Sequence, residues 1–261
     1  MGTSWVLGHV WGIRVRLHSF AVLWVGLSFL YFKSPSVALA TNGLLFLSVF
    51  LHELGHCFGA RFVRGEASEI LLHPFGGLSR LRVPRTPWSE FASTAAGPLT
   101  NLGLALLGLA LVALLGHAVP SSAREALRAL QQPVSLPWAL SALVVINGAL
   151  FVFNVLPAYP MDGGRLLRAA LWPLVGWRNA TVVAICAAFA CGLAAISFGL
   201  SRGALLLAAL GVWVLYASGR ELKRALGARD PSRDTDRLPH EERRSPAQYH
   251  DDDLMPHERK P

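Results

Sequence analysis

Residues 46–63, FLSVFLHELGHCFGARFV, place two histidines and a glutamate inside an otherwise apolar run. Burying an ionisable group in hydrocarbon costs about 2.5–3.5 kcal/mol on insertion scales, so such groups mark functional sites by default. Two structures accommodate the stretch. It is either a membrane-spanning helix that contains a working site, or the core helix of a soluble protein with a polar cluster.

The composition of the whole chain favours the membrane. Of its 261 residues, 53% are hydrophobic and only 15% are charged, whereas soluble domains carry roughly 25% charged residues. A membrane span needs about 20 predominantly apolar residues. We therefore predict an all-α polytopic membrane protein with six transmembrane helices, in the stretches 17–32, 37–63, 88–119, 136–156, 181–200 and 203–218.

Shorter elements are expected between and beside these spans. Residues 5–16 alternate loosely and predict a short strand at the inner membrane surface, and Gly76-Gly77 indicates a β-hairpin after the second span. Residues 163–180 mix Arg, Trp and Leu as an interfacial helix does. From residue 225 the chain is rich in charged residues and proline, which predicts a disordered cytoplasmic tail. The membrane domain is thus expected to occupy 1–224 and the tail 225–261.

The net charge of +8 is distributed as membrane topology requires. With six spans and an inner N-terminus, only Lys33, Arg124, Arg128 and Arg202 of the 24 lysines and arginines fall in outer loops. The positive-inside rule then places both termini in the cytoplasm. This pattern predicts a multi-pass protein of the cell membrane, whose partner is the lipid bilayer and not nucleic acid.

The pentapeptide His52-Glu53-Leu54-Gly55-His56 has the spacing of a metal site. Positions i and i+4 of a helix share a face, so both imidazoles can reach one cation. Zinc suits these ligands, and a catalytic zinc takes three protein ligands and leaves one position for water. Glu53 is next to His52 and is close enough to accept a proton from that water. We expect it to take this role and not to be a metal ligand. The alternative, hydrogen-bonded packing histidines, is less consistent with two histidines and a glutamate in one span.

Asp162 is the strongest candidate for the third ligand. It lies in NVLPAYPMDGGR, residues 154–165, where its simplest interpretation is a turn with Asp in its usual place. Topology favours a ligand, because the second and fourth spans both run from outside to inside. His52 and His56 then lie in the C-terminal half of one span and Asp162 at the C-terminal end of the other. The two motifs meet at one depth on the cytoplasmic side, which predicts one Zn²⁺ per chain.

At these residues the chain resembles a known family. HELGH in the second span together with NVLPAYPMDGG in the fourth is similar to the site-2 protease family, the intramembrane zinc metalloproteases of peptidase family M50. HPFGGLSRL at 73–81 and AAGPLTN at 95–101 resemble the same family. The resemblance implies zinc ligation by His52, His56 and Asp162, with Glu53 as the catalytic base. It also implies that Asn154 lies near the site and holds the substrate backbone or the oxyanion.

The resemblance implies an intramembrane endopeptidase that cleaves membrane-anchored substrates near the cytoplasmic leaflet. A substrate helix must unwind before its peptide bonds can be reached, so substrates with helix-destabilising spans are expected. The segment Phe75-Gly76-Gly77 either offers an edge to which a substrate strand adds or anchors a loop at the surface. Asn147, seven residues before Asn154, is expected to form a helix-to-helix hydrogen bond.

Two other function classes share parts of this pattern. Prenyl-protein proteases pair HExxH with a downstream glutamate, and Glu221 is the acid near the inner end of the sixth span. A non-enzymatic adaptor or a metal-ion carrier of the same architecture is the other alternative. A carrier places ionisable residues in several spans along a path, whereas here they gather in two. An adaptor has usually lost the base or a ligand, and all four residues are present.

Overall fold

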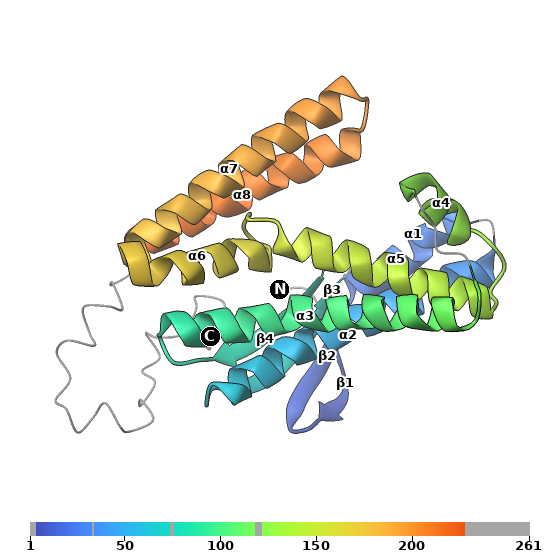
Figure 1. Cartoon of the computed structure of the whole chain (residues 1–261), viewed down its shortest axis with the longest axis horizontal. Coiled ribbons are helices and arrows are strands. Elements are labelled where there is room, and N and C mark those ends of the chain that lie inside the picture. The colour runs from blue at the N-terminus through green and yellow to red at the C-terminus, as the bar shows by residue number, and fades with distance from the viewer. Residues whose placement is uncertain (1–3, 33, 74–75, 118–121, 228–261) are drawn as a thin grey trace. The chain divides into compact units, whose positions relative to one another are not determined.

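The computed structural model describes residues 4–32, 34–73, 76–117 and 122–227, which form eight helices and four strands (Figure 1). The chain divides into two compact units. Among the described residues, the first unit takes those within 1–61, 66–81 and 96–152, and the second takes those within 62–65, 82–95 and 153–227. The second, third and fifth helices contribute residues to both units.

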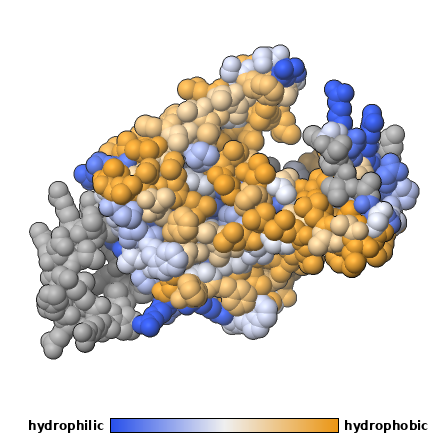
Figure 2. All heavy atoms as spheres, viewed as in Figure 1, coloured by the Kyte–Doolittle hydropathy of each residue, from blue (hydrophilic) through white to orange (hydrophobic). Residues whose placement is uncertain are grey.

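Five of the helices are long and apolar enough to cross a membrane. Many of their large apolar side chains are exposed, including Leu106 on α3 and Leu206 on α8, and Figure 2 shows such side chains over much of the visible helical surface. Apolar helices with exposed apolar faces identify an integral, multi-pass membrane protein. The five helices are α2 (Pro35–Phe62), α3 (Pro87–Leu114), α5 (Leu136–Val155), α7 (Trp177–Ser201) and α8 (Leu205–Gly227).

A four-stranded sheet in the first unit has the order β1-β2-β3-β4. Its strands are β1 (Ser4–Val10), β2 (Ile13–His18), β3 (Glu66–His73) and β4 (Gly76–Arg82). β1 and β2 are antiparallel, and β2 pairs with β3 in parallel, with Arg14 opposite Glu69. Alternate residues of β2 and β3, such as Ile13 and Ile70, pack against α2 around Leu54 and Cys57.

Two predictions about this sheet were wrong in detail. The N-terminal segment forms two strands and not one, because Trp11 and Gly12 turn the chain with φ of 49° and 80°, as a two-residue hairpin loop requires. Gly76 and Gly77 are not the turn of the second hairpin but the first residues of β4. The predicted turn residue Phe75 lies outside the described residues.

The prediction of six helical spans is not confirmed. The first apolar helix, α1 (Phe20–Tyr31), has 12 residues, which rise about 18 Å against a hydrocarbon core of about 30 Å. The contacts of β2 account for this shortness. The β1–β2 turn lies at the C-terminal end of α2, where Arg61 donates to the carbonyl of Trp11 at 2.8 Å, and Trp11 contacts the ring of Phe58.

From that end of α2, β2 runs back along the helix and α1 follows it. The rise of the 6 residues of β2 is about 20 Å. Added to the rise of α1, this approaches the length of the 28-residue α2, about 42 Å. Strand β2 and helix α1 together therefore cover a distance that the sequence pattern assigned to one helix.

The second unit contains α6 (Asp162–Val175) with α7 and α8. The predicted interfacial segment is indeed helical, and Ala158, Tyr159 and Met161 before it pack against α7 and α8. In the first unit, the short helix α4 (Ala123–Ala129) precedes α5. Helix α8 continues to Gly227, and the predicted disordered tail beyond it lies outside the described residues.

Candidate metal centre

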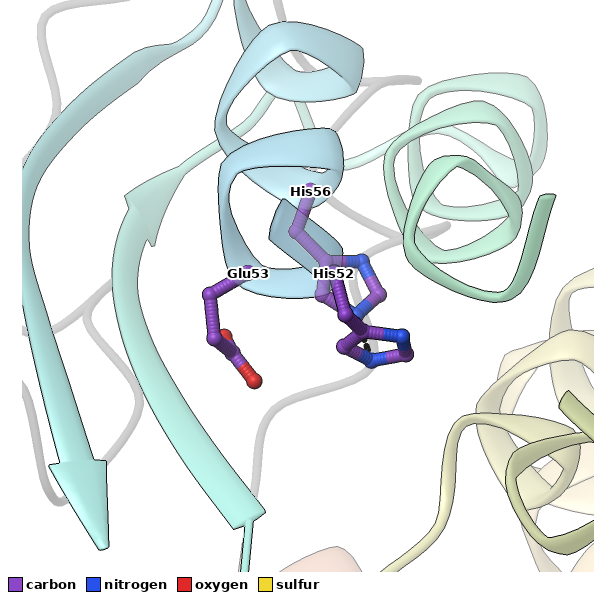
Figure 3. A group of neighbouring side chains, drawn as sticks. All are labelled: His52, Glu53 and His56. Carbon is purple, nitrogen blue, oxygen red and sulfur yellow. Dashed lines mark hydrogen bonds between the residues drawn. The ribbon is translucent and has the colours of Figure 1, made fainter. Parts of the chain in front are cut away.

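Helix α2 places His52, Glu53 and His56 in its C-terminal half, where each is 5–6% exposed. The two imidazoles lie on one face, and their Nε2 atoms are 3.0 Å apart (Figure 3). Two nitrogens that each lie about 2.0–2.1 Å from one zinc ion are at most about 4.2 Å apart. The spacing of the two histidines is therefore compatible with a shared ion.

The donor set fits zinc in chemistry as well as in spacing. One ligand atom from each of His52, Glu53 and His56 lies within 4.8 Å of the others. The other ring nitrogen of His52, Nδ1, lies 2.6 Å from Oδ1 of Asn101, so a hydrogen bond orients the ring. Paired imidazoles whose second nitrogens are held by an outer partner are typical of zinc sites. The residues of α2 thus suit the metal that the sequence predicts.

Strand β4 holds Glu53 on the side of α2 that faces the sheet (Figure 3). The hydroxyl of Ser79 donates to Oε2 of Glu53 and lies 3.3 Å from its backbone carbonyl oxygen. Gly77 passes so close that a Cβ there would lie 2.1 Å from Cγ of Glu53. The carboxylate therefore has a fixed orientation, as a general base requires.

Two glycines let α3 approach the histidines. A Cβ at Gly55, the glycine of HELGH, would lie 2.4 Å from Oγ1 of Thr100 and 2.7 Å from the carbonyl oxygen of Ala96. A Cβ at Gly97 would lie 2.3 Å from Nε2 of His56. Real Cβ atoms essentially never come this close to other atoms. Both glycines are therefore explained by the close contact between α2 and α3.

Replacing Gly97 by alanine should displace the ring of His56 and weaken zinc binding. We expect zinc affinity to fall by at least 10–100-fold (about 1.4–2.7 kcal/mol), the range that is typical of changes beside a ligand. Gly103 on the same helix has open space around its Cβ position, so Gly103→Ala is the matched control and should stay within about twofold of wild type. Competition with a chelator on the purified protein measures both, and equal affinities for the two variants would contradict the packing argument.

Comparison with known proteins places this site in a family. Residues 40–196, more than half of the chain, match the model of peptidase family M50. The chain belongs to peptidase family M50. It is thus a member of the site-2 protease family of zinc metalloproteases, as the motifs predict.

Individual relatives agree with this assignment. Zinc metalloprotease MJ0392 of Methanocaldococcus jannaschii is 30% identical over 85% of this chain and 61% of its own length. The Synechocystis protein sll0528 is 38% identical over 55% of this chain and 34% of its own length. A solved structure, the site-2 protease from Methanocaldococcus jannaschii, matches with a TM-score of 0.57 and 26% identity over 84% of this chain and 95% of that one. This chain thus spans between a third and two thirds of the two relatives' lengths.

In this M50 member, Asp162 and Asn154 lie in the second unit. Asp162 begins α6 and is 8% exposed, and the positive end of the helix dipole stabilises a carboxylate there. A Cβ at Gly163 would lie 2.0 Å from the carbonyl oxygen of Leu156, so only glycine allows the chain to fold back this tightly. Asn154 is half-buried near the end of α5. Their participation in the metal site on α2 stays a prediction.

Glu221, the acid of the alternative prenyl-protease arrangement, is engaged elsewhere within the second unit. Arg168 of α6 binds it at 3.5 Å and also forms a buried ion pair with Glu90. Burial alone would lower the pKa of Arg168. The neighbouring carboxylates, Glu90 above all, outweigh burial and raise the pKa of Arg168 above its ordinary value. Arg224 lies 3.3 Å from the second oxygen of Glu221. Glu221 therefore acts as the counter-ion of two arginines.

Sequence reasoning missed Asn101 and Ser79. Both lie in stretches that were noted for family resemblance, AAGPLTN and HPFGGLSRL, but no helical or strand periodicity assigns them to the site. Their roles follow from tertiary contacts with His52 and Glu53. The expectation for Asn147 is confirmed, since it bonds to Asn101 of α3 and to Ser48 of α2.

Proposed function

We propose that the chain is an intramembrane zinc endopeptidase that cleaves spans of membrane-anchored proteins near the cytoplasmic leaflet. The observation that carries this proposal is the buried His-Glu-His group inside a helix that is long and apolar enough to cross a membrane. A soluble peptidase has no need of such a helix. Membership in the M50 family supports the same class of reaction.

Each proposed site residue has a distinct task. His52 and His56 would hold the zinc through Nε2, and Asp162 would be the third ligand. A zinc ion held there would supply a water with a pKa lowered to about 7 and would polarise the substrate carbonyl. Glu53, oriented by Ser79, accepts the proton from the attacking water and passes it to the leaving amine. Asn154 holds the substrate backbone or the developing oxyanion.

The position of β4 supports a role in holding substrate. It is the last strand of the described sheet, so its outer edge can pair with an unwound substrate segment. Such a segment would lie along the strand whose Gly77 and Ser79 contact Glu53. Substrates with helix-destabilising residues meet this requirement most readily, because their backbone groups are already free to pair. The alternative is that segment 75–77 only anchors a loop at the surface and does not contact substrate.

The charge distribution and the first unit support a cytoplasmic location of both termini. β2 precedes α1 and β3 follows α2, yet the two strands pair in one sheet. The chain must therefore leave that sheet and return to it, which requires an even number of crossings between β2 and β3. Helix α2 makes one of these crossings, and α1 together with the end of β2 makes the other. The backbone of β2 is paired on both sides, as a low-dielectric environment requires.

An adaptor or metal-carrier role is less consistent with this site. An adaptor that only binds other proteins has no use for a buried carboxylate held by a serine hydroxyl beside two histidines. Burying the Glu53 carboxylate costs free energy, and a protein without catalytic activity has no chemical task for it that would offset this cost. We therefore place the protease first.

Metal removal tests the proposal directly. The purified chain is reconstituted in vesicles with a single-span substrate that carries glycine and proline in its cytoplasmic half. Cleavage should occur in that half, stop when a chelator removes the metal, and return when zinc is added. A substrate with an all-leucine span is the control and should be cleaved more slowly. Cleavage that persists in the chelator, or that falls at the outer end of the span, would contradict the proposal.

A further inference from the structure

A chain of buried hydrogen bonds connects His52 to two other helices. His52 Nδ1 lies 2.6 Å from Oδ1 of Asn101 on α3, and Nδ2 of Asn101 donates to Oδ1 of Asn147 on α5 at 2.8 Å. Nδ2 of Asn147 donates in turn to the carbonyl oxygen of Leu143 at 2.9 Å and to Oγ of Ser48 on α2 at 3.1 Å. We call the four side chains of Ser48, Asn147, Asn101 and His52 the asparagine relay.

The relay lies entirely inside the first unit and away from solvent. Asn101 and Asn147 are 0% exposed and Ser48 is 1% exposed. A buried polar group that loses its partner costs about 1–3 kcal/mol, so two fully buried amides in apolar helices need a reason. Because the relay starts and ends on α2, one turn apart, it also ties α3 and α5 to the helix that holds the metal ligands.

The backbone carbonyl of Leu143 fixes the direction of every hydrogen bond in the relay. A carbonyl oxygen can only accept, so Asn147 must present its NH₂ group there. The Oδ1 of Asn147 then faces Asn101, so Asn101 must donate to it from its own NH₂ group. Oδ1 of Asn101 is left to face His52, so Nδ1 of His52 must carry the proton. In this tautomer Nε2 bears the lone pair, and Nε2 is the atom that faces His56.

We propose that the asparagine relay is a positioning device that sets the tautomer and ring orientation of His52 for metal binding. The inference rests on the proposed function, because it takes His52 as a ligand. Both asparagines are fully buried, and the relay reaches the site only through Nδ1 of His52. Their contribution is to keep the His52 lone pair aimed at the position between the two histidines before any metal arrives, which removes the cost of a tautomer change and a ring rotation from binding.

Zinc affinity of Asn101 variants distinguishes this role from simple packing. Asn101→Leu fills the space but cannot accept from Nδ1, and should weaken zinc binding by about 10–100-fold, the usual effect of an outer partner. Asn101→Asp keeps the acceptor and should bind zinc within about threefold of wild type. A packing role predicts the opposite order, because a buried carboxylate disturbs an apolar interior more than leucine does.

The experiment uses the full chain in detergent, with affinity measured against a chelating dye and folding followed by thermal unfolding. Asn42→Leu is the matched control, because Asn42 is a buried asparagine on α2 that bonds to Ser28 and to the carbonyl of Ala38. It should leave zinc affinity unchanged. If Asn101→Leu does not fold, Asn147→Leu takes its place, since it leaves Asn101 present but without its orienting partner, and a severalfold loss of affinity is expected.

Each outcome decides one claim. Wild-type protein that binds no zinc would remove the proposed function itself. If Asn101→Leu and Asn147→Leu bind zinc as tightly as the wild-type protein does, the proposed function stands and the relay is overturned. A loss for Asn101→Asp equal to or greater than that for Asn101→Leu would also overturn it.

Discussion

Glutamine in place of Glu53 should lower the rate of substrate cleavage by about 10²–10⁴-fold, the range assigned to loss of a positioned general base. The amide cannot accept a proton from water at neutral pH. It has nearly the same shape as the carboxylate, and its oxygen still accepts from the hydroxyl of Ser79, the donor that orients Glu53. The fold and the histidine pair should therefore be preserved, and the loss should appear in kcat and not in zinc content.

The measurement is cleavage of a fluorescent single-span substrate in vesicles, with zinc per chain determined on the same samples. Glu66→Gln is the matched control, since Glu66 is an exposed acid at the start of β3, and it should cleave at the wild-type rate. Full activity of Glu53→Gln would overturn the role given to Glu53. A fall in zinc content parallel to activity would instead indicate that Glu53 is a ligand.

Helical periodicity predicted the part of the site that lies on one element. His52 and His56 are four residues apart, so their shared face follows from 3.6 residues per turn, and the structure places their Nε2 atoms 3.0 Å apart. The same reasoning predicted six spans, five of which the structure has as long apolar helices, because spans are read from length and composition alone. Partners from other elements were not predictable in this way. Asn101 and Ser79 reach the site through packing of α3 and β4, which no local pattern encodes.

The first crossing shows a different limit of sequence reasoning. Residues 17–32 are mostly apolar, but helix α1 begins only at Phe20, while Leu17 and His18 end strand β2. Hydropathy does not mark this boundary, because Leu17 packs with α2 beside Ile13 and Val15 of the strand. The turn at Trp11-Gly12 was also missed, because tryptophan is an unusual residue at positive φ.

Removal of Asp162 should abolish tight zinc binding. A catalytic zinc takes three protein ligands, so Asp162→Ala would leave only the two histidines. The loss of affinity should exceed the 10–100-fold that follows from changing an outer partner. Asp162 also lies in the first turn of α6, where a carboxylate contributes about 0.3–1 kcal/mol to helix stability. Thermal unfolding of the metal-free variant separates this small structural effect from loss of the ligand.

Glu221→Gln decides between the two arrangements that the histidine pair permits. Glu221 neutralises Arg168 and Arg224, and glutamine keeps a hydrogen-bond acceptor for both, so zinc affinity should stay close to wild type. If instead Glu221→Gln loses zinc and Asp162→Ala retains it, the third ligand lies on α8 and the prenyl-protease arrangement is correct. The two variants therefore predict opposite results under the two hypotheses. A single titration of zinc against each is enough to choose, because the expected difference is more than a hundredfold.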